Sequence, residues 1–251
     1  KSLAITVISI VALFYGLSFV LNTQTPISAV VSCSMVPNVN RGDLIVVQGS
    51  QDYVAPLSAS GDVVPLFRPE TEILFKGKPA GKMNGSLFSY CYGRIDPLCI
   101  QFRDNPSAFA ERRGMFTFNY GECWRSSGKE ACVVSISAGN QSYDLRQGNA
   151  GDVIVYRPEE GTLFSTLGDT IHRAIVKVVD GNNTYYLTKG DNNNVFDVQF
   201  YKGLYNTPPE KAQVLGKVIL KVPFLGYYKI FITPYLSEGE LCSKPLSFTP
   251  Q

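Results

Sequence analysis

The sequence contains a single histidine and a single tryptophan among its 251 residues, and its charges nearly cancel, with a formal net charge of +2. No basic stripe of the kind that binds nucleic-acid phosphates is present, and the cysteines and histidine lack the spacing of a zinc site. These absences argue against a nucleic-acid-binding protein. We expect neither a metal nor a cofactor.

Long amphipathic helical patterns are also lacking after residue 22. Short apolar runs are instead separated by Gly, Asn, Asp and Pro, which is typical of strands joined by turns. These runs lie at 44–47, 63–67, 115–118, 132–136, 153–156, 171–179 and 184–188. No internal repeat is present, and we predict a mainly β fold.

The exception is the segment 3–21, which carries no charge and consists mainly of Ile, Val, Leu, Phe and Ala. As a helix it would span roughly 28 Å, which matches the hydrocarbon core of a bilayer. The segment runs on through Pro26 without the short apolar core and cleavage site of a signal peptide. We therefore predict a retained membrane anchor, with Lys1 inside and everything after Asn22 outside.

Three glycosylation acceptors and six cysteines agree with this extracytoplasmic location, because both suit an oxidising, secretory compartment. The acceptors begin at Asn84, Asn140 and Asn182. Four of the cysteines are near one another in sequence and can form two disulfides in any of three connectivities: Cys91, Cys99, Cys123 and Cys132. The other two, Cys33 and Cys242, look isolated.

The only histidine, His172, lies in the predicted strand 171–179, where alternation places it on an apolar face. An imidazole there is an available base. If the turn 180–183 leaves its four residues unpaired, the register carries His172 opposite Asp191, with Cβ atoms about 5 Å apart. A change of one residue in the loop would turn Asp191 to the other face of the sheet.

A nucleophile is suggested by the run 32–37, Ser-Cys-Ser-Met-Val-Pro, which follows the apolar segment and precedes Arg-Gly-Asp at 41–43. A serine hydroxyl is a poor nucleophile until a base removes its proton, and that base needs a group that holds its tautomer. Ser34, His172 and an aspartate supply these three roles.

The order and surroundings of these segments resemble the type I signal peptidases, specifically their endoplasmic-reticulum and archaeal branch. The matching segments are the anchor leading through 26–31, then 32–37 with 41–43, 151–156, 171–175 and 187–193, and more loosely 214–226. The resemblance implies a serine endopeptidase that removes signal peptides from exported preproteins. It would cleave after small residues, through an acyl-enzyme on Ser34.

The resemblance also implies the roles of individual residues. Ser34 is the nucleophile, and His172 occupies the position where the bacterial branch carries a lysine base. The third member falls on Asp197, six residues after Asp191, while the hairpin register favours Asp191, so both remain candidates. The oxyanion is held by the Ser34 N–H with help from the Ser32 hydroxyl.

The chain departs from the family at Cys33, where glycine or a small polar residue is common. Neighbouring residues on an extended segment point opposite ways, so we expect Cys33 to be a small buried residue and not a second nucleophile. The connection 50–150 is a larger departure, because it is short in compact relatives. It is either a strand-rich elaboration or a module that selects substrates or binds a partner.

We therefore divide the chain into a transmembrane anchor (1–22), a catalytic β domain (23–49 and 151–221), an inserted β-rich region (50–150) and an apolar carboxyl-terminal segment (222–251). This last segment lies at the membrane surface or packs on the ectodomain. The expected location is the extracytoplasmic side of an archaeal cell membrane or of the endoplasmic reticulum. Expected partners are secretory preproteins, the lipid bilayer, and an export translocon or accessory subunits.

Two alternatives compete with this interpretation. In one, the chain is a membrane-tethered, β-rich binding or scaffold protein that keeps the motifs but does not cleave. In the other, it is a Ser/Lys protease whose base is a strand lysine such as Lys177 or Lys189. Cleavage that survives His172→Ala but not substitution of the lysine would favour the second alternative.

Overall fold

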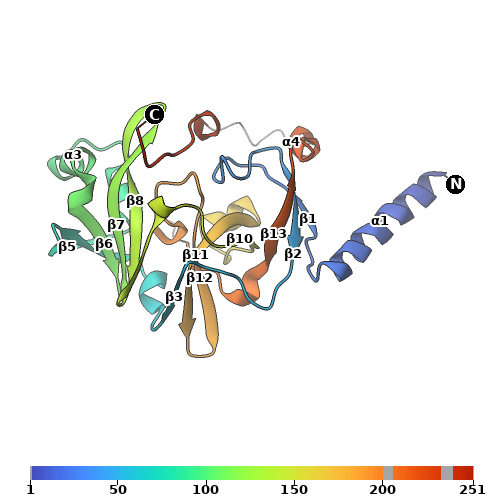
Figure 1. Cartoon of the computed structure of the whole chain (residues 1–251), viewed down its shortest axis with the longest axis horizontal. Coiled ribbons are helices and arrows are strands. Elements are labelled where there is room, and N and C mark those ends of the chain that lie inside the picture. Colours follow the sequence, from blue (N-terminus) through green and yellow to red (C-terminus); the bar gives the residue numbers. More distant parts are fainter. Residues whose placement is uncertain (1, 200–205, 233–239, 251) are drawn as a thin grey trace.

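The computed structural model describes residues 2–199, 206–232 and 240–250, which form two largely antiparallel sheets packed against each other and a projecting amino-terminal helix (Figure 1). The predicted mainly β fold is thus confirmed. One expected strand is wrong: residues 63–67 contain the 3-10 turn Val64–Phe67, in which Pro65 takes an early helical position. Proline suits the start of a helical turn because its missing N–H would have no partner there.

The first sheet carries the segments that resemble the signal peptidases. Its strand order is β1-β2-β13-β10-β11-β12, and β3 adds to β11 in parallel. The bounds are β1 Ile27–Ala29, β2 Leu44–Gln48, β3 Leu57–Ser60, β10 Val153–Tyr156, β11 Thr170–Asp180, β12 Asn183–Lys189 and β13 Val214–Val222.

The second sheet comes entirely from residues 70–144 and has the order β5-β4-β6-β7-β8-β9. Its bounds are β4 Glu70–Phe75, β5 Lys78–Asn84, β6 Phe109–Arg113, β7 Phe116–Arg125, β8 Gly128–Ala138 and β9 Gln141–Asp144. Two short helices, α2 Leu87–Cys91 and α3 Pro97–Asp104, connect β5 to β6. Because β3 lies within 50–150 but joins the first sheet, the predicted domain boundaries stay a prediction.

The remaining helical elements are short, apart from α1 Ser2–Val20. They are α4 Tyr227–Ile232 and the 3-10 turns Val64–Phe67, Pro106–Ala108, Leu145–Gln147, Phe164–Leu167, Asp197–Gln199, Lys211–Gln213 and Glu240–Ser243. Within the described ranges, none of the helices combines the length and the apolar character needed to traverse a bilayer. The anchor predicted for residues 1–22 therefore stays a prediction.

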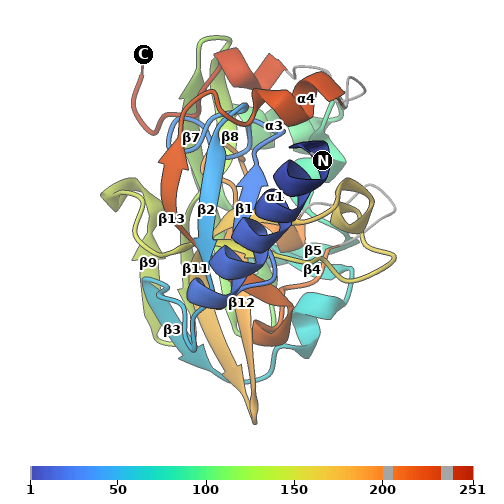
Figure 2. The same cartoon turned by 90° about the vertical axis from the view of Figure 1, so that its right-hand side faces the viewer.

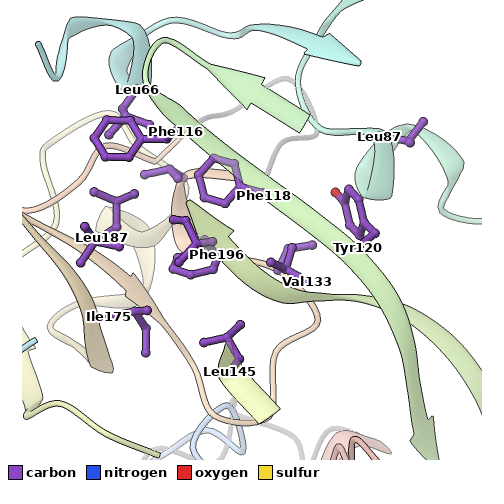
Figure 3. Packing of buried hydrophobic residues seen from close by; sticks show 14 of the residues in the cluster. Leu66, Leu87, Phe116, Phe118, Tyr120, Val133, Leu145, Ile175, Leu187 and Phe196 are labelled. Carbon is purple, nitrogen blue, oxygen red and sulfur yellow. The ribbon is translucent and has the colours of Figure 1, made fainter. Parts of the chain in front are cut away.

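One apolar core joins the two sheets (Figure 3). Phe116 and Phe118 of β7 lie with Leu187 of β12 and Phe196 in the same buried cluster, and all four side chains are fully buried. The rings of Phe118 and Phe196 meet edge to face at 5.2 Å. Burying such a side chain stabilises a fold by about 1.5–3 kcal/mol, so the second sheet is bound firmly to the first.

All six cysteines form disulfides, and one pairing corrects the sequence analysis. Cys91 pairs with Cys99 and Cys123 with Cys132, one of the three connectivities left open. Cys33 and Cys242 are not isolated but bonded to each other, with Cα atoms 5.0 Å apart across a sequence separation of 209. The residue before Ser34 is therefore tied to the carboxyl-terminal segment.

Candidate active site

The segment that contains Ser34 lies in the loop between β1 and β2 and packs against the residues that follow β12. Met35 is almost fully buried and anchors the loop in an apolar cluster with Val30 and Ile45. The backbone N–H of Asn192 donates to the Ser34 carbonyl oxygen at 2.7 Å. The loop is thus fixed from both sides while Ser34 stays partly exposed.

His172 lies on β11 and is only 3% exposed. Its Nδ1 is 2.6 Å from Oδ2 of Asp197, which stands in the 3-10 turn after β12. The same carboxylate oxygen accepts hydrogen bonds from the Thr188 hydroxyl at 2.6 Å and from the Tyr156 hydroxyl at 3.0 Å. Burial, and after it the Asp197 charge, raises the pKa of Tyr156 well above its usual value, so this phenol stays a donor.

Asp191 is not opposite His172, so that prediction is wrong. Val179 pairs with Thr184 as expected, but the register shifts by one residue between Ala174 and Val176, which leaves Arg173 opposite Lys189. An extra residue in one strand of a ladder has this effect. It turns Asp191 to the other face, where it forms a two-pronged ion pair with Arg173 at 2.8 and 2.7 Å.

Asp191 instead joins the nucleophile loop, which is the β1–β2 loop that contains Ser34, to the first sheet. Its Oδ2 accepts from the Asn38 side-chain amide at 2.8 Å, while both of its oxygens bind Arg173. The pair is largely buried, with side-chain exposures of 9% and 5%. Of the two predicted aspartates, the structure brings Asp197 to His172 and leaves Asp191 in a supporting position.

Ser34 and His172 are brought into the same region by the β11–β12 hairpin. Continuing the register one step past Arg173 and Lys189 sets His172 opposite Gly190. A Cβ added to Gly190 would be 2.7 Å from the Ser34 carbonyl oxygen, so only glycine permits this approach. Between these two described side chains there is no hydrogen bond, and catalytic contacts are commonly long before substrate binds.

The proposed oxyanion donors lie together on the exposed side of the loop. The Ser32 and Ser34 hydroxyl oxygens are 3.2 Å apart. Among the described residues, nothing accepts a hydrogen bond from the Ser34 backbone N–H. This N–H is therefore available to a substrate oxygen, as an oxyanion donor must be.

The two candidate lysines have different environments. Lys177 Nζ pairs with Asp52 at 2.6–2.7 Å. Lys189 is buried, and its ammonium donates to the Gly190 carbonyl at 3.2 Å. It neighbours Thr188 along the strand, so it points to the face of β12 opposite the one that bears Thr188 and His172.

Burial lowers the pKa of Lys189 from 10.5 to about 8, because the charged ammonium is poorly solvated there. Between these two pH values the unfolded chain binds more protons than the folded chain, so stability rises with pH. We expect the free energy of unfolding of the native chain to increase from pH 8 to pH 10 relative to Lys189→Met. Urea titrations of both proteins measure this difference, and parallel pH profiles would contradict it.

Two residues that hold Asp197 were missed by the sequence analysis. Thr188 and Tyr156 both lie in segments that resemble the family, and Thr188 pairs with Ala174, two positions from His172. Strand alternation could therefore have placed the Thr188 hydroxyl on the face of His172. The turn that carries Asp197 has no such periodicity. Among the described residues, no three His, Cys, Asp or Glu side chains converge as metal ligands do.

Comparisons with known proteins find signal peptidase subunits among the relatives of this chain. No protein-family model matches the chain. The signal peptidase complex catalytic subunit SEC11 of Fusarium vanettenii is 32% identical over 92 residues, 36% of this chain and 49% of that protein. SEC11 of Verticillium alfalfae is 30% identical over 91 residues, with the same two coverages. This chain thus spans about half the length of these relatives.

A further relative aligns with most of the chain. An uncharacterized protein of Methanocaldococcus jannaschii is 25% identical over 210 residues, which cover 83% of this chain and 84% of that protein.

Proposed function

We propose that this chain is a membrane-bound serine endopeptidase that removes signal peptides from exported preproteins. The premise is its similarity to the SEC11 catalytic subunits of the signal peptidase complex. The observation that carries the proposal is the 2.6 Å contact between His172 and Asp197. It is supported by the loop of Ser34, which packs on Gly190 beside His172. A Ser-His-Asp triad requires the serine hydroxyl close to the imidazole, and the imidazole close to the carboxylate.

In the proposed mechanism, Asp197 accepts the Nδ1–H of His172, which keeps the lone pair of Nε2 available as a base. As a substrate peptide binds, Nε2 takes the Ser34 proton while Oγ attacks the scissile carbonyl carbon. The tetrahedral intermediate collapses with cleavage of the C–N bond, and the imidazolium protonates the leaving amine. In the second half of the reaction, His172 takes a proton from water as the water oxygen attacks the acyl ester. The imidazolium then protonates Ser34 Oγ as the ester bond breaks.

The Ser34 N–H and the Ser32 hydroxyl would stabilise the oxyanion in this scheme. The Ser34 N–H donates to no acceptor among the described residues, and the two serine hydroxyl oxygens are 3.2 Å apart. A donor aimed at the developing charge is worth roughly 3–4 kcal/mol in enzymes of this kind. The preference for small residues before the cut comes from the resemblance to the family.

We place the enzyme on the extracytoplasmic side of an archaeal cell membrane or of the endoplasmic reticulum. Three disulfides and exposed acceptor asparagines at 84, 140 and 182 support that side. The substrates are secretory preproteins. Because the relatives are named as subunits of a signal peptidase complex, accessory subunits are proposed partners, and an export translocon is another.

Membrane contact is supported by an apolar surface around α4, which we call the α4 patch: Leu220, Phe224, Leu225, Tyr228 and Phe231. Phe224 is 77% exposed and Phe231 90%. Figure 2 shows α4 on the side of the molecule from which α1 projects, so both could meet one bilayer. Aromatic side chains are favoured at that interface.

We expect the double substitution Phe224→Ser/Phe231→Ser to slow cleavage of a bilayer-embedded precursor about fivefold, since partial burial of two phenyl rings in lipid is worth ~1 kcal/mol. Cleavage of a water-soluble peptide should not change. The measurement compares both substrates with the full chain in liposomes. Tyr92→Ser, which removes another exposed aromatic side chain, is the matched control. Equal slowing on both substrates would contradict a role at the membrane.

The proposed activity is tested by incubating the purified chain with a precursor that carries a signal peptide and sequencing the products. One cut after a small residue is the expected result. A chain that binds the precursor without cutting it would favour the scaffold alternative. Cleavage lost in Lys189→Met but kept in His172→Ala would favour the Ser/Lys alternative.

A further inference from the structure

Arg125, at the end of β7 in the second sheet, is a buried cation with a complete set of partners. Its side chain is 2% exposed. A guanidinium has five N–H donors, and five hydrogen bonds are present. Their acceptors are Glu130 Oε2 at 3.0 Å, Asn192 Oδ1 at 2.7 Å, Lys244 O at 2.5 Å, Asn192 O at 2.7 Å and Asn194 Oδ1 at 2.9 Å.

Asn192 transmits this arrangement to the nucleophile loop. Its Oδ1 receives N–H donors from Arg125 and from the backbone of Leu246 at 2.8 Å. Only the amide oxygen can accept two donors, so the orientation of the amide group is settled by the network. Its Nδ2 consequently faces the other way and donates to the Cys33 carbonyl oxygen at 3.0 Å.

These contacts fix the orientation of the Cys33–Ser34 peptide plane. Asn192 donates from its side chain to the Cys33 carbonyl at 3.0 Å and from its backbone to the Ser34 carbonyl at 2.7 Å. A trans peptide is planar, with its C=O and N–H pointing in opposite directions. A fixed Cys33 carbonyl therefore fixes the direction of the Ser34 N–H, the proposed oxyanion donor.

We infer that Arg125 is a positioning residue for catalysis: by locking the Asn192 amide, it aims the Ser34 N–H at the oxyanion. The inference rests on the proposed function. It gives the second sheet a role in the reaction, because Arg125 comes from the β7–β8 hairpin and contacts Asn192, which holds the nucleophile loop. Arginine is needed because a lysine has three donors on a flexible stem and cannot bridge Glu130, Asn192 and Asn194 as a planar fork does.

The experiment compares the full chain with Arg125→Lys and Asn192→Asp in peptide cleavage. Arg125→Lys keeps the buried charge, and Asn192→Asp keeps the shape but puts an oxygen against the Cys33 carbonyl. A misaimed oxyanion donor affects the transition state and not substrate binding, so we expect kcat to fall by about 10- to 100-fold. KM should stay within about twofold of the native value.

Arg112→Lys is the matched control, because Arg112 lies in the same sheet but is 43% exposed and pairs with Glu72. Its kcat should equal that of the native chain. A second readout is independent of activity: the ¹⁵N resonance of the Ser34 amide, which responds to the hydrogen bond on the preceding carbonyl, should move in Arg125→Lys and stay in Arg112→Lys.

The outcomes separate the inference from the proposed function. Native cleavage with unchanged kcat in both test variants would overturn the positioning role alone. A rise in KM with unchanged kcat would overturn it too, since that pattern indicates a substrate contact. If the native chain does not cleave, the proposed function fails, and the Ser34 resonance then decides: no movement in Arg125→Lys overturns the inference.

Discussion

Ser34→Ala and His172→Ala should each reduce cleavage of a signal-peptide substrate by roughly 10⁴- to 10⁶-fold, because residues that act as a unit fail together when any one is removed. Without the Ser34 hydroxyl no acyl-enzyme can form. Without the imidazole, the proposed mechanism has no base that takes the Ser34 proton. The measurement is kcat from the rate of product formation at saturating peptide.

Two controls show that the loss comes from the chemistry and not from unfolding. Ser58→Ala removes an exposed hydroxyl from β3 in the same sheet and should be fully active. Far-ultraviolet circular dichroism and the melting temperature of Ser34→Ala should match those of the native chain, since Ser34 is partly exposed. His172 is buried against Phe164, so some loss of stability is expected there. Substantial cleavage by either variant would refute the roles proposed for these residues.

The mainly β fold could be predicted from the sequence because six of the thirteen described strands, β2, β7, β8, β10, β11 and β12, have local apolar signals. The runs at 153–156 and 184–188 are apolar, bounded by turn residues, and form β10 and most of β12. The run at 63–67 failed because apolar composition alone does not exclude a 3-10 turn, and Pro65 gave the contrary signal. Apolar composition identifies buried segments, whereas proline restricts the backbone conformation because its φ is fixed and it has no N–H donor for a sheet.

The pairing of His172 could not be predicted, because it depends on a register shift of one residue. The turn was correctly expected to bring Val179 opposite Thr184. No local sequence signal marks the shift between Ala174 and Val176. Its consequence is large: it separates Asp191 from His172 and leaves that place to Asp197, which the family resemblance had suggested.

The Cys33–Cys242 disulfide and the Arg125 network were equally beyond sequence reasoning. Both join positions far apart in the chain, Cys33 with Cys242 and Arg125 with Asn192. Neither pair shares a strand or a turn, so no periodicity relates them. Together they hold the residue before Ser34 through its side chain and its carbonyl, which gives the nucleophile loop a rigid support that the loop sequence alone does not reveal.

Asp197→Asn should lower kcat by about 10⁴-fold, the loss known for a triad whose imidazole is held in the wrong tautomer. The carboxylate makes its side-chain contacts through Oδ2, whereas Oδ1 is buried with no hydrogen-bond partner in the described part of the chain. An amide nitrogen at Oδ1 would leave its donors unpaired, at a cost of about 1–3 kcal/mol. The nitrogen should therefore occupy the Oδ2 side.

In that orientation the amide donates to His172 Nδ1, which moves the imidazole proton to Nε2 and removes the lone pair that Ser34 needs. KM should change little, because the substrate does not touch this buried turn. Asp191→Asn is the control: it weakens the Arg173 pair and should lower the melting temperature but keep kcat within about tenfold of native, since its contacts act on position and not on the tautomer. If Asp191→Asn lost activity while Asp197→Asn kept it, the catalytic carboxylate would be the one on the opposite face of β11, and the His172–Asp197 contact would be structural.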